Sequence, residues 1–169
     1  MNNLALSITS AILMGLGATL TFDLWALFLK HAFQIAPSSL CLVGRWLRHM
    51  PEGTFVHQNI VSSPRKNAEC TVGWFAHYSI GVTFAIAFVA LAGSNWLQHP
   101  TPIPAFVFGA VTVLAPFLIL QPAFGFGLAA SKAPNPRQAR LRSLMNHIAF
   151  GAGLYLFGWL ANWLLWSFA

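Results

Sequence analysis

Four stretches of this sequence are long and apolar enough to cross a lipid bilayer, and they constrain the fold more than any other feature. They cover residues 4–29, 71–97, 103–130 and 144–168, and Asp23 is the single charged residue within them. A membrane-spanning helix needs about 20 mostly apolar residues, and backbone groups in lipid must hydrogen-bond within their own segment. The sequence therefore predicts an all-α fold in which residues 1–169 form a single transmembrane domain, a four-helix bundle.

The composition excludes the other broad classes of protein. The chain is 57% hydrophobic and 7% charged, whereas a water-soluble domain carries roughly 25% charged residues. Two cysteines are too few for a disulfide-rich secreted scaffold, and the apolar content excludes a disordered chain. The first apolar stretch lacks the basic start and the cleavage site of a signal peptide, so we expect it to be a permanent span.

The basic residues predict the orientation. All nine lie in two connections, residues 30–70 and 131–143, and the remaining connection and the ends have none. Cytoplasmic loops of membrane proteins carry the excess of Lys and Arg. We therefore expect a multi-pass protein of the bacterial inner (cytoplasmic) membrane with both loops in the cytoplasm and both termini periplasmic. Orientation also explains the pI of about 10.2, so the expected partner is the lipid bilayer with its anionic headgroups, and no nucleic acid.

The first cytoplasmic loop contains the pattern of a short helix. Pro37-Ser38-Ser39 is a helix-start signal, and the residues after it repeat apolar side chains at helical spacing. We expect an amphipathic helix lying on the inner leaflet, with Trp46 at the interface and one apolar face. That face comprises Leu40, Val43, Leu47 and Met50, with Arg45, Arg48 and His49 elsewhere.

Two more helix boundaries can be placed. Asn135-Pro136 predicts the start of the last helix, because Asn caps a helix well and Pro suits its first position. Pro116 and Pro122 interrupt the third span. We expect a kinked helix that breaks near Gln121, with residues 122–131 packed near the inner surface.

Polar residues inside the spans are costly and usually face protein or water. In the predicted orientation Asp23, His77, Gln121 and His147 all fall in the inner leaflet, one on each span. Steps of four residues from three of them reach Thr19 and Gly15, Gly81 and Ala85, and Gly151. Small residues at that spacing mark close helix contacts. We therefore expect Asp23, His77 and His147 to point into the bundle and to meet.

The chemistry of this polar cluster has several interpretations. It could be purely structural, since buried polar groups are hydrogen-bonded in any case. Asp23, His77 and His147 could instead bind a divalent metal, and the two histidines could ligate haem. A carboxylate–histidine pair could also relay protons in a small-molecule transporter, or act on a lipid headgroup. A non-catalytic subunit of a membrane complex, or a homo-oligomer, is a further alternative, so whether the protein is an enzyme stays open.

Other residues have simpler expectations. The basic side chains at the inner rim are candidates for contact with a headgroup or phosphate, beyond their role in orientation. We expect His31, His49, His57 and His99 to be solvated. Cys41 and Cys70 should face the cytoplasm, where thiols stay reduced, so a disulfide is not expected. The candidate headgroup contacts are Arg45, Lys132, Arg140 and Arg142.

Several strings resemble a known family. They are Gly17-Ala18-Thr19 through Asp23-Leu24-Trp25, Gly73-Trp74-Phe75-Ala76-His77-Tyr78, Gln121-Pro122-Ala123-Phe124-Gly125 through Ala129-Ala130-Ser131-Lys132, and Asn146-His147 through Gly151-Ala152-Gly153-Leu154-Tyr155. They are similar to an uncharacterised bacterial domain-of-unknown-function family of small four-span inner-membrane proteins. The resemblance covers nearly the whole chain. It implies the bundle and the membrane location, and it implies no activity.

Overall fold

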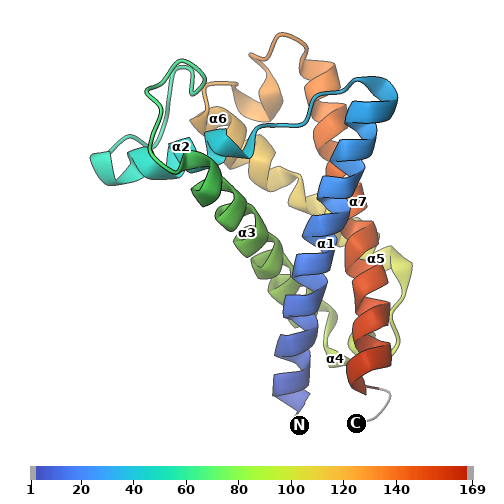
Figure 1. The fold of residues 1–169 in the computed structure, drawn as a ribbon. Helices are drawn as coiled ribbons and strands as arrows, with labels where there is room; N and C mark the ends of the chain where they lie inside the picture. Colours follow the sequence, from blue (N-terminus) through green and yellow to red (C-terminus); the bar gives the residue numbers. More distant parts are fainter. Residues whose placement is uncertain (1–2, 167–169) are drawn as a thin grey trace. The chain divides into compact units, whose positions relative to one another are not determined.

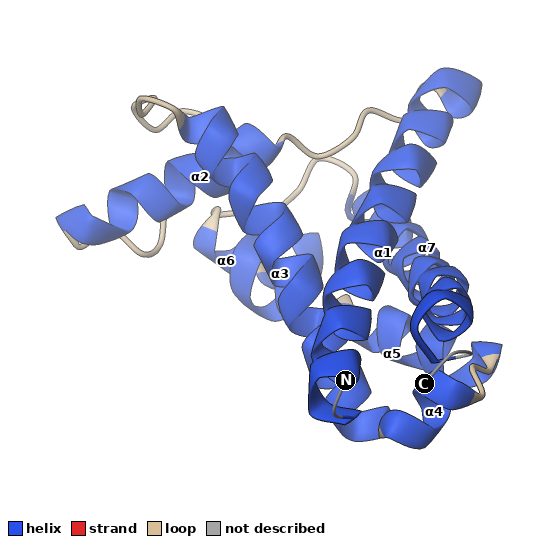
Figure 2. Ribbon diagram, turned by 60° about the horizontal axis from the view of Figure 1, so that its bottom comes forward, coloured by secondary structure: helices blue, strands red, loops and turns tan. Residues whose placement is uncertain are grey.

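The computed structural model describes residues 3–166, which form helices joined by loops (Figures 1 and 2). The α-helices are α1 (Asn3–Phe33), α2 (Leu40–His49), α3 (Glu69–Ala92), α4 (Ser94–Gln98), α5 (Pro102–Thr112), α6 (Gln121–Ala123) and α7 (Pro136–Ala161). Two 3₁₀ helices, Met50–Glu52 and Leu128–Ala130, and two π-helices, Pro116–Leu120 and Asn162–Trp166, complete the described chain.

Within residues 3–166, four helical segments are long and apolar enough to cross a membrane. They are Leu4–Phe33, Glu69–Ala92, Pro102–Ala123 and Pro136–Trp166. The prediction of an all-helical fold with four membrane-length helices is therefore confirmed. Residues 167–168, at the end of the predicted fourth span, lie outside the described residues.

The chain divides into two compact units. Unit 1 comprises Met1–Pro37, Tyr78–Thr112 and Met145–Ala169, and unit 2 comprises Ser38–His77 and Val113–Leu144. Helices α3 and α7 each contribute to both units, because the division falls within them.

Unit 1 is held by helices that touch through glycine. A β-carbon on Gly15 of α1 would come within 2.4 Å of the Val82 Cα of α3, and one on Gly109 of α5 would come within 2.5 Å of the Gly151 Cα of α7. The Thr19 hydroxyl lies against Gly81 in the same way. These contacts confirm that the small-residue faces predicted from spacing are packing faces.

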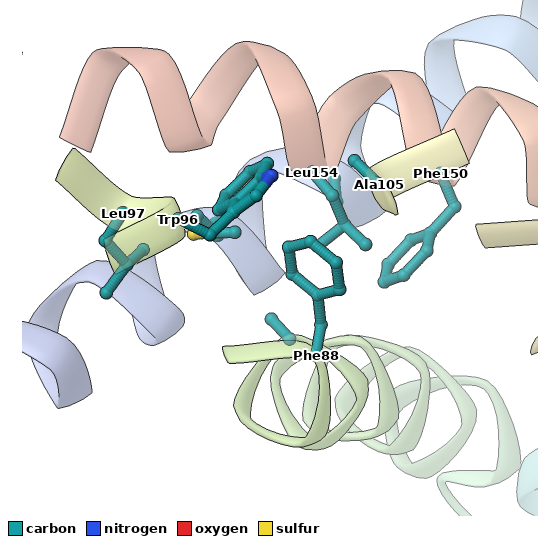
Figure 3. Close-up of a cluster of buried hydrophobic side chains, with 9 residues drawn as sticks. Phe88, Trp96, Leu97, Ala105, Phe150 and Leu154 are labelled. Atoms are coloured by element: carbon teal, nitrogen blue, oxygen red, sulfur yellow. The ribbon is translucent and has the colours of Figure 1, made fainter. Parts of the chain in front are cut away.

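Larger side chains fill the remaining space of unit 1. Phe88 of α3 packs edge-on against Trp96 of α4, with ring centroids 4.7 Å apart. Phe150 and Leu154 of α7 belong to the same cluster, which Figure 3 shows. Aromatic rings therefore supply much of the bulk of this core.

The second span ends earlier than predicted. The sequence favoured a helix to Leu97, but α3 stops at Ala92 because Gly93 has φ +81°, a left-handed conformation that ends an α-helix. The short helix α4 then carries Trp96 and Leu97 into the unit 1 core. Asn162 donates two hydrogen bonds, to the carbonyls of Leu97 and Gln98 at 3.0 and 2.9 Å, and so fastens this turn.

The third span is interrupted after Thr112, where α5 ends, and helical turns continue to Ala123. Pro102–Ala123 thus forms one membrane-length segment that ends close to Gln121, as predicted. Pro116 has no N–H to donate to the Thr112 carbonyl four residues earlier, and its ring crowds that carbonyl. The chain continues as a π-helix from Pro116 to α6, which ends at Ala123.

Unit 2 is built around α2, the helix predicted in the first loop. The helix begins after Ser39 as expected, and its apolar side chains Leu40, Val43 and Leu47 pack with Ile60 and Phe124. The amphipathic face is thus covered by protein. Its contact with a membrane surface stays a prediction.

The loop after α2 folds back on the end of α6. The backbone N–H groups of His57 and Ile60 donate to the carbonyls of Ala123 and Phe124, at 2.8 and 3.0 Å. Trp46 donates from its indole nitrogen to the Phe55 carbonyl at 2.7 Å, so it packs on protein. At the start of α7 the Asn135 side chain accepts the Gln138 N–H at 3.2 Å, which confirms the predicted cap.

Candidate functional sites in each unit

The first polar contact of unit 1 joins α1 to α3. The Tyr78 hydroxyl donates to the Asp23 carboxylate at 3.1 Å. Tyr78 lies one turn before Gly81, the glycine that contacts Thr19 of α1. The sequence analysis did not single out Tyr78. Its spacing of three residues from Gly81 places it on the same helix face, and this spacing could have identified it. Asp23 is thereby held at the contact between α1 and α3.

The second polar contact of unit 1 joins α5 to α7. The Thr112 hydroxyl lies 2.6 Å from the Gly109 carbonyl and 2.8 Å from Nδ1 of His147. A hydroxyl has one proton. If Thr112 gives it to the carbonyl, His147 must carry a proton on Nδ1 and donate it to Thr112. The His147 ring also packs edge-on against Phe22, beside Asp23, with centroids 5.6 Å apart.

The other two members of the predicted cluster lie in unit 2. His77 packs edge-on against Trp74, with ring centroids 6.3 Å apart. The Gln121 amide donates to the Ser143 hydroxyl at 3.5 Å, and its oxygen is buried without a hydrogen-bond partner. Asp23 and His147 therefore lie in one unit, where Phe22, the neighbour of Asp23 in the sequence, contacts the His147 ring. His77 and Gln121 lie in the other unit and contact different residues.

The predicted metal ligands are Asp23, His77 and His147. Within residues 3–166 no group of three or more His, Cys, Asp or Glu side chains is arranged to hold a metal ion. Asp23 and His147 belong to one unit and His77 to the other. Metal or haem ligation by these residues stays a prediction.

A groove runs between α1 and α7 in unit 1, where the two helices lie side by side (Figure 1). Its volume is about 540 Å³. Its walls are almost wholly apolar. They consist of Thr21, Leu24, Trp25 and Phe28 from α1, and Met145, Ile148, Ala149 and Ala152 from α7. The only hydroxyl in the walls, that of Thr21, donates to the Gly17 carbonyl at 2.8 Å.

Unit 2 contains a buried ion pair that the sequence did not predict. Arg45 donates from Nε and Nη2 to the two carboxylate oxygens of Glu69, at 2.8 Å each. Its third nitrogen donates to the carbonyls of Ile60, Val61 and Ser63. The prediction that Arg45 contacts a lipid headgroup is therefore wrong, because all three guanidinium nitrogens are already bonded within the protein and the side chain is 7% exposed.

The two cysteines form a disulfide, which corrects the expectation that they stay reduced. Cys41 of α2 and Cys70 of α3 are bonded, with Cα atoms 3.9 Å apart. The surrounding sequence repeats, since Cys41-Leu42-Val43-Gly44 and Cys70-Thr71-Val72-Gly73 share the form Cys-x-Val-Gly. This repeat was the signal that sequence reasoning overlooked.

The repeat corresponds to a nearly symmetric contact. A β-carbon on Gly44 would meet the carbonyl oxygen of Glu69, the residue before Cys70, at 1.7 Å. One on Gly73 would meet the carbonyl oxygen of Leu40, the residue before Cys41, at 1.9 Å. Each glycine thus admits the first turn of the other helix. Only glycine allows backbones this close, and the closeness sets the two sulfurs within bonding reach.

Two histidines expected to be solvated are buried. His49 and His57 are each 7% exposed, and their ring centroids lie 5.0 Å apart. His49 Nε2 faces the Pro64 carbonyl at 3.1 Å, and His57 Nδ1 lies 3.0 Å from the Ser63 hydroxyl. The prediction failed because helix α2 turns His49 inward and the fold-back of the loop covers His57.

One comparison with known proteins identifies the family. The family described as "Protein of unknown function (DUF2938)" matches residues 12–161. The chain belongs to this family. No curated protein and no solved structure shows a significant match to the chain. The match includes the polar contacts, the groove, the ion pair and the disulfide, and it assigns no activity to a DUF2938 protein.

Charge is distributed unevenly in this DUF2938 protein. Unit 2 holds eight of the nine basic residues and two of the three acidic ones. Both of these acids are paired, Glu69 with Arg45 and Glu52 with Lys66. The remaining bases of unit 2 therefore make a strongly positive region. Those on its surface are Arg48, Arg65, Lys132, Arg137 and Arg140.

Three of these bases lie together at the start of α7. Arg137 and Arg140 are one turn apart on the helix, and Arg140 donates from Nε to the Ala129 carbonyl at 2.7 Å. Lys132, three residues beyond Ala129, is exposed. We name Lys132, Arg137 and Arg140 the α7 basic patch. No acidic residue follows Glu69 in the sequence, so neither the last helix nor the segment before it neutralises this patch.

Proposed function

We propose that this DUF2938 protein is an integral protein of the bacterial inner membrane that binds anionic phospholipid, with the α7 basic patch as the headgroup site. The observation that carries the proposal is the concentration of exposed, unneutralised bases at one helix start. Lys132, Arg137 and Arg140 supply positive charge, and the N-terminus of α7 adds its partial positive charge. Helix N-termini and arginine side chains are preferred partners of phosphate.

Unit 1 offers a lipid contact of its own, the groove between α1 and α7. A cavity of this volume is in the range that holds small ligands, and its walls are apolar along both helices. The helices that form it are membrane-length, so the medium beside it is lipid hydrocarbon. The occupant that fits is one acyl chain, because a chain needs no hydrogen-bond partner and the wall offers almost none.

Orientation is part of the proposal. The basic residues predict that the α7 basic patch lies on the cytoplasmic side, where anionic lipids attract basic segments. Reporter fusions at position 53 in the first basic loop and at the C-terminus test this. A reporter that is active only in the cytoplasm should be active at position 53. A reporter that is active only in the periplasm should be active at the C-terminus. The reverse result would place the patch on the other leaflet.

Lipid retention tests the headgroup site. The full chain is purified in a mild detergent, and the bound phosphatidylglycerol, cardiolipin and phosphatidylethanolamine are measured by mass spectrometry. The variant Lys132→Gln/Arg137→Gln/Arg140→Gln should retain about tenfold less anionic lipid than the wild type. The reason is that each lost contact with a phosphate costs about 0.5 to 1 kcal/mol. The matched control Arg48→Gln/Arg65→Gln, which removes exposed bases elsewhere in unit 2, should retain it.

A second variant tests the acyl chain. Ala149→Phe places a ring in the groove and should lower the retention of all three lipids to a similar degree, because every one of them has acyl chains. Ala152→Phe serves as a replicate from the same wall. Equal anionic lipid in the wild type, the patch variant and the control variant would refute the headgroup site, whatever the groove variants show.

A further inference from the structure

The Cys41–Cys70 disulfide has an unusual electrostatic setting. Cys41 is the second residue of α2 and Cys70 is the second residue of α3, so two helix N-termini meet at one pair of sulfurs. The partial positive charge at a helix N-terminus favours a thiolate over a thiol. Stabilising both thiolates favours the reduced pair, which makes the disulfide easier to reduce than one in a neutral setting.

The two sulfurs differ in access. Cys70 is exposed and Cys41 is half-buried. An incoming thiolate reaches the exposed sulfur first, and the covered one is then the leaving group. The difference therefore favours attack at Cys70 with Cys41 as the leaving group.

The scaffold around the disulfide does not depend on the bond. Gly44 and Gly73 hold the first turns of α2 and α3 in contact. The bidentate pair of Arg45 and Glu69 joins the same two turns. Neither contact uses the sulfur atoms, so we expect the two cysteines to stay close together after reduction and to close again without unfolding.

We propose that Cys41 and Cys70 form a redox-active pair that exchanges its disulfide with a protein or small-molecule dithiol. The partner's thiolate attacks Cys70 Sγ, the Cys41–Cys70 bond breaks, and Cys41 leaves as a thiolate that takes up a proton. The partner's second thiolate then attacks its own sulfur in the mixed disulfide and releases Cys70. Two electrons pass to this chain, and the partner becomes a disulfide. A partner disulfide reverses the sequence.

The direction of exchange in the cell rests on the orientation proposed above. In the cytoplasm a disulfide is typically transient and catalytic or redox-sensing. The exchange chemistry itself depends on neither orientation nor lipid, so the headgroup proposal and this one can fail separately.

The test uses the full chain in mild detergent and two single-cysteine variants. Cys41→Ser leaves Cys70, and Cys70→Ser leaves Cys41. Each is incubated with oxidised glutathione, and the glutathione adduct is followed by mass spectrometry. The native Cys70 adduct should form about tenfold faster than the Cys41 adduct, and faster than the same Cys70 in denaturant, where the helix N-terminus is lost.

The wild type supplies the second measurement. Dithiothreitol should reduce the folded protein without denaturant, oxidised glutathione should restore the bond, and the thermal midpoint should shift by a few degrees at most. Reduction that occurs only after unfolding would overturn the proposal and make the bond structural. Equal rates for the two single-cysteine variants, or a native Cys70 no faster than the denatured one, would overturn it as well.

Discussion

Gly15 of α1 lies so close to α3 that a β-carbon on it would be 2.4 Å from the Cα of Val82. The neighbouring atoms are backbone, so no side chain can rotate away. The separation of these two helices is therefore fixed by the absence of a side chain at residue 15. That contact lies two turns from Asp23 along α1 and one turn from Tyr78 along α3, and it sets the distance across which their hydrogen bond forms.

Gly15→Ala should force α1 and α3 apart and destabilise the protein by about 1–3 kcal/mol, the usual cost of overpacking. Denaturant titration in detergent measures the loss. Leu16→Ala on the same helix is the control, since Leu16 is exposed and its removal should cost little. Similar losses in the two variants would contradict the helix contact.

Arg45→Leu should destabilise unit 2 by about 2–3 kcal/mol, because Glu69 would keep its buried carboxylate and lose two charged hydrogen bonds. Adding Glu69→Leu removes the orphaned charge and should recover part of the loss. Arg48→Leu, exposed on the same helix, is the control for helix propensity. The measurement is the free energy of unfolding of the wild type, Arg45→Leu, the double variant and Arg48→Leu. A double variant less stable than Arg45→Leu would contradict the ion pair between Arg45 and Glu69.

The Thr112 and His147 contact can be measured by a double-mutant cycle. Thr112→Val removes the hydroxyl that bridges the Gly109 carbonyl and His147, and His147→Leu removes the ring nitrogen. We expect a coupling of about 0.6–1.7 kcal/mol, the range found for hydrogen bonds between membrane helices. Additive effects of the two substitutions would show that the residues do not interact.

His57 should make stability depend on pH. Its pKa lies below its ordinary value, first because burial disfavours the charged ring and second because His49 repels a charge there. The unfolded chain therefore takes up the proton first as the pH falls. The contribution of neutral His57 is complete above about pH 6.5 and is lost as the pH drops below it.

Thermal midpoints in detergent at pH 8.0 and pH 5.5 measure this effect. The wild type should melt lower at pH 5.5, and His57→Gln should reduce that difference. The lowered pKa of Glu52, caused first by the hydrogen bond from Lys66, acts only below about pH 4.5 and so lies outside this window. A difference that is unchanged in His57→Gln would assign the pH dependence to another group.

Local patterns in the sequence were enough to predict the helices. Apolar length predicted four membrane-length segments, the Ser39 and Asn135 caps placed two helix starts, and spacing by four residues identified Gly15, Gly81 and Gly151 as contact positions. These features depend on residues a few positions apart, where helix geometry is nearly fixed. The end of the second span at Ala92 was misplaced, because it depends on a glycine in the left-handed conformation, Gly93.

The sequence by itself determined the class of the protein, its four apolar helices and the faces on which they carry small and polar residues. Only the tertiary structure decided which of these faces meet. It paired Cys41 with Cys70 and Arg45 with Glu69 across more than 20 residues, and it buried His49 and His57. The reason is physical: a periodic pattern fixes which side of a helix a residue occupies, whereas its partner depends on how the chain folds back through loops that have no period.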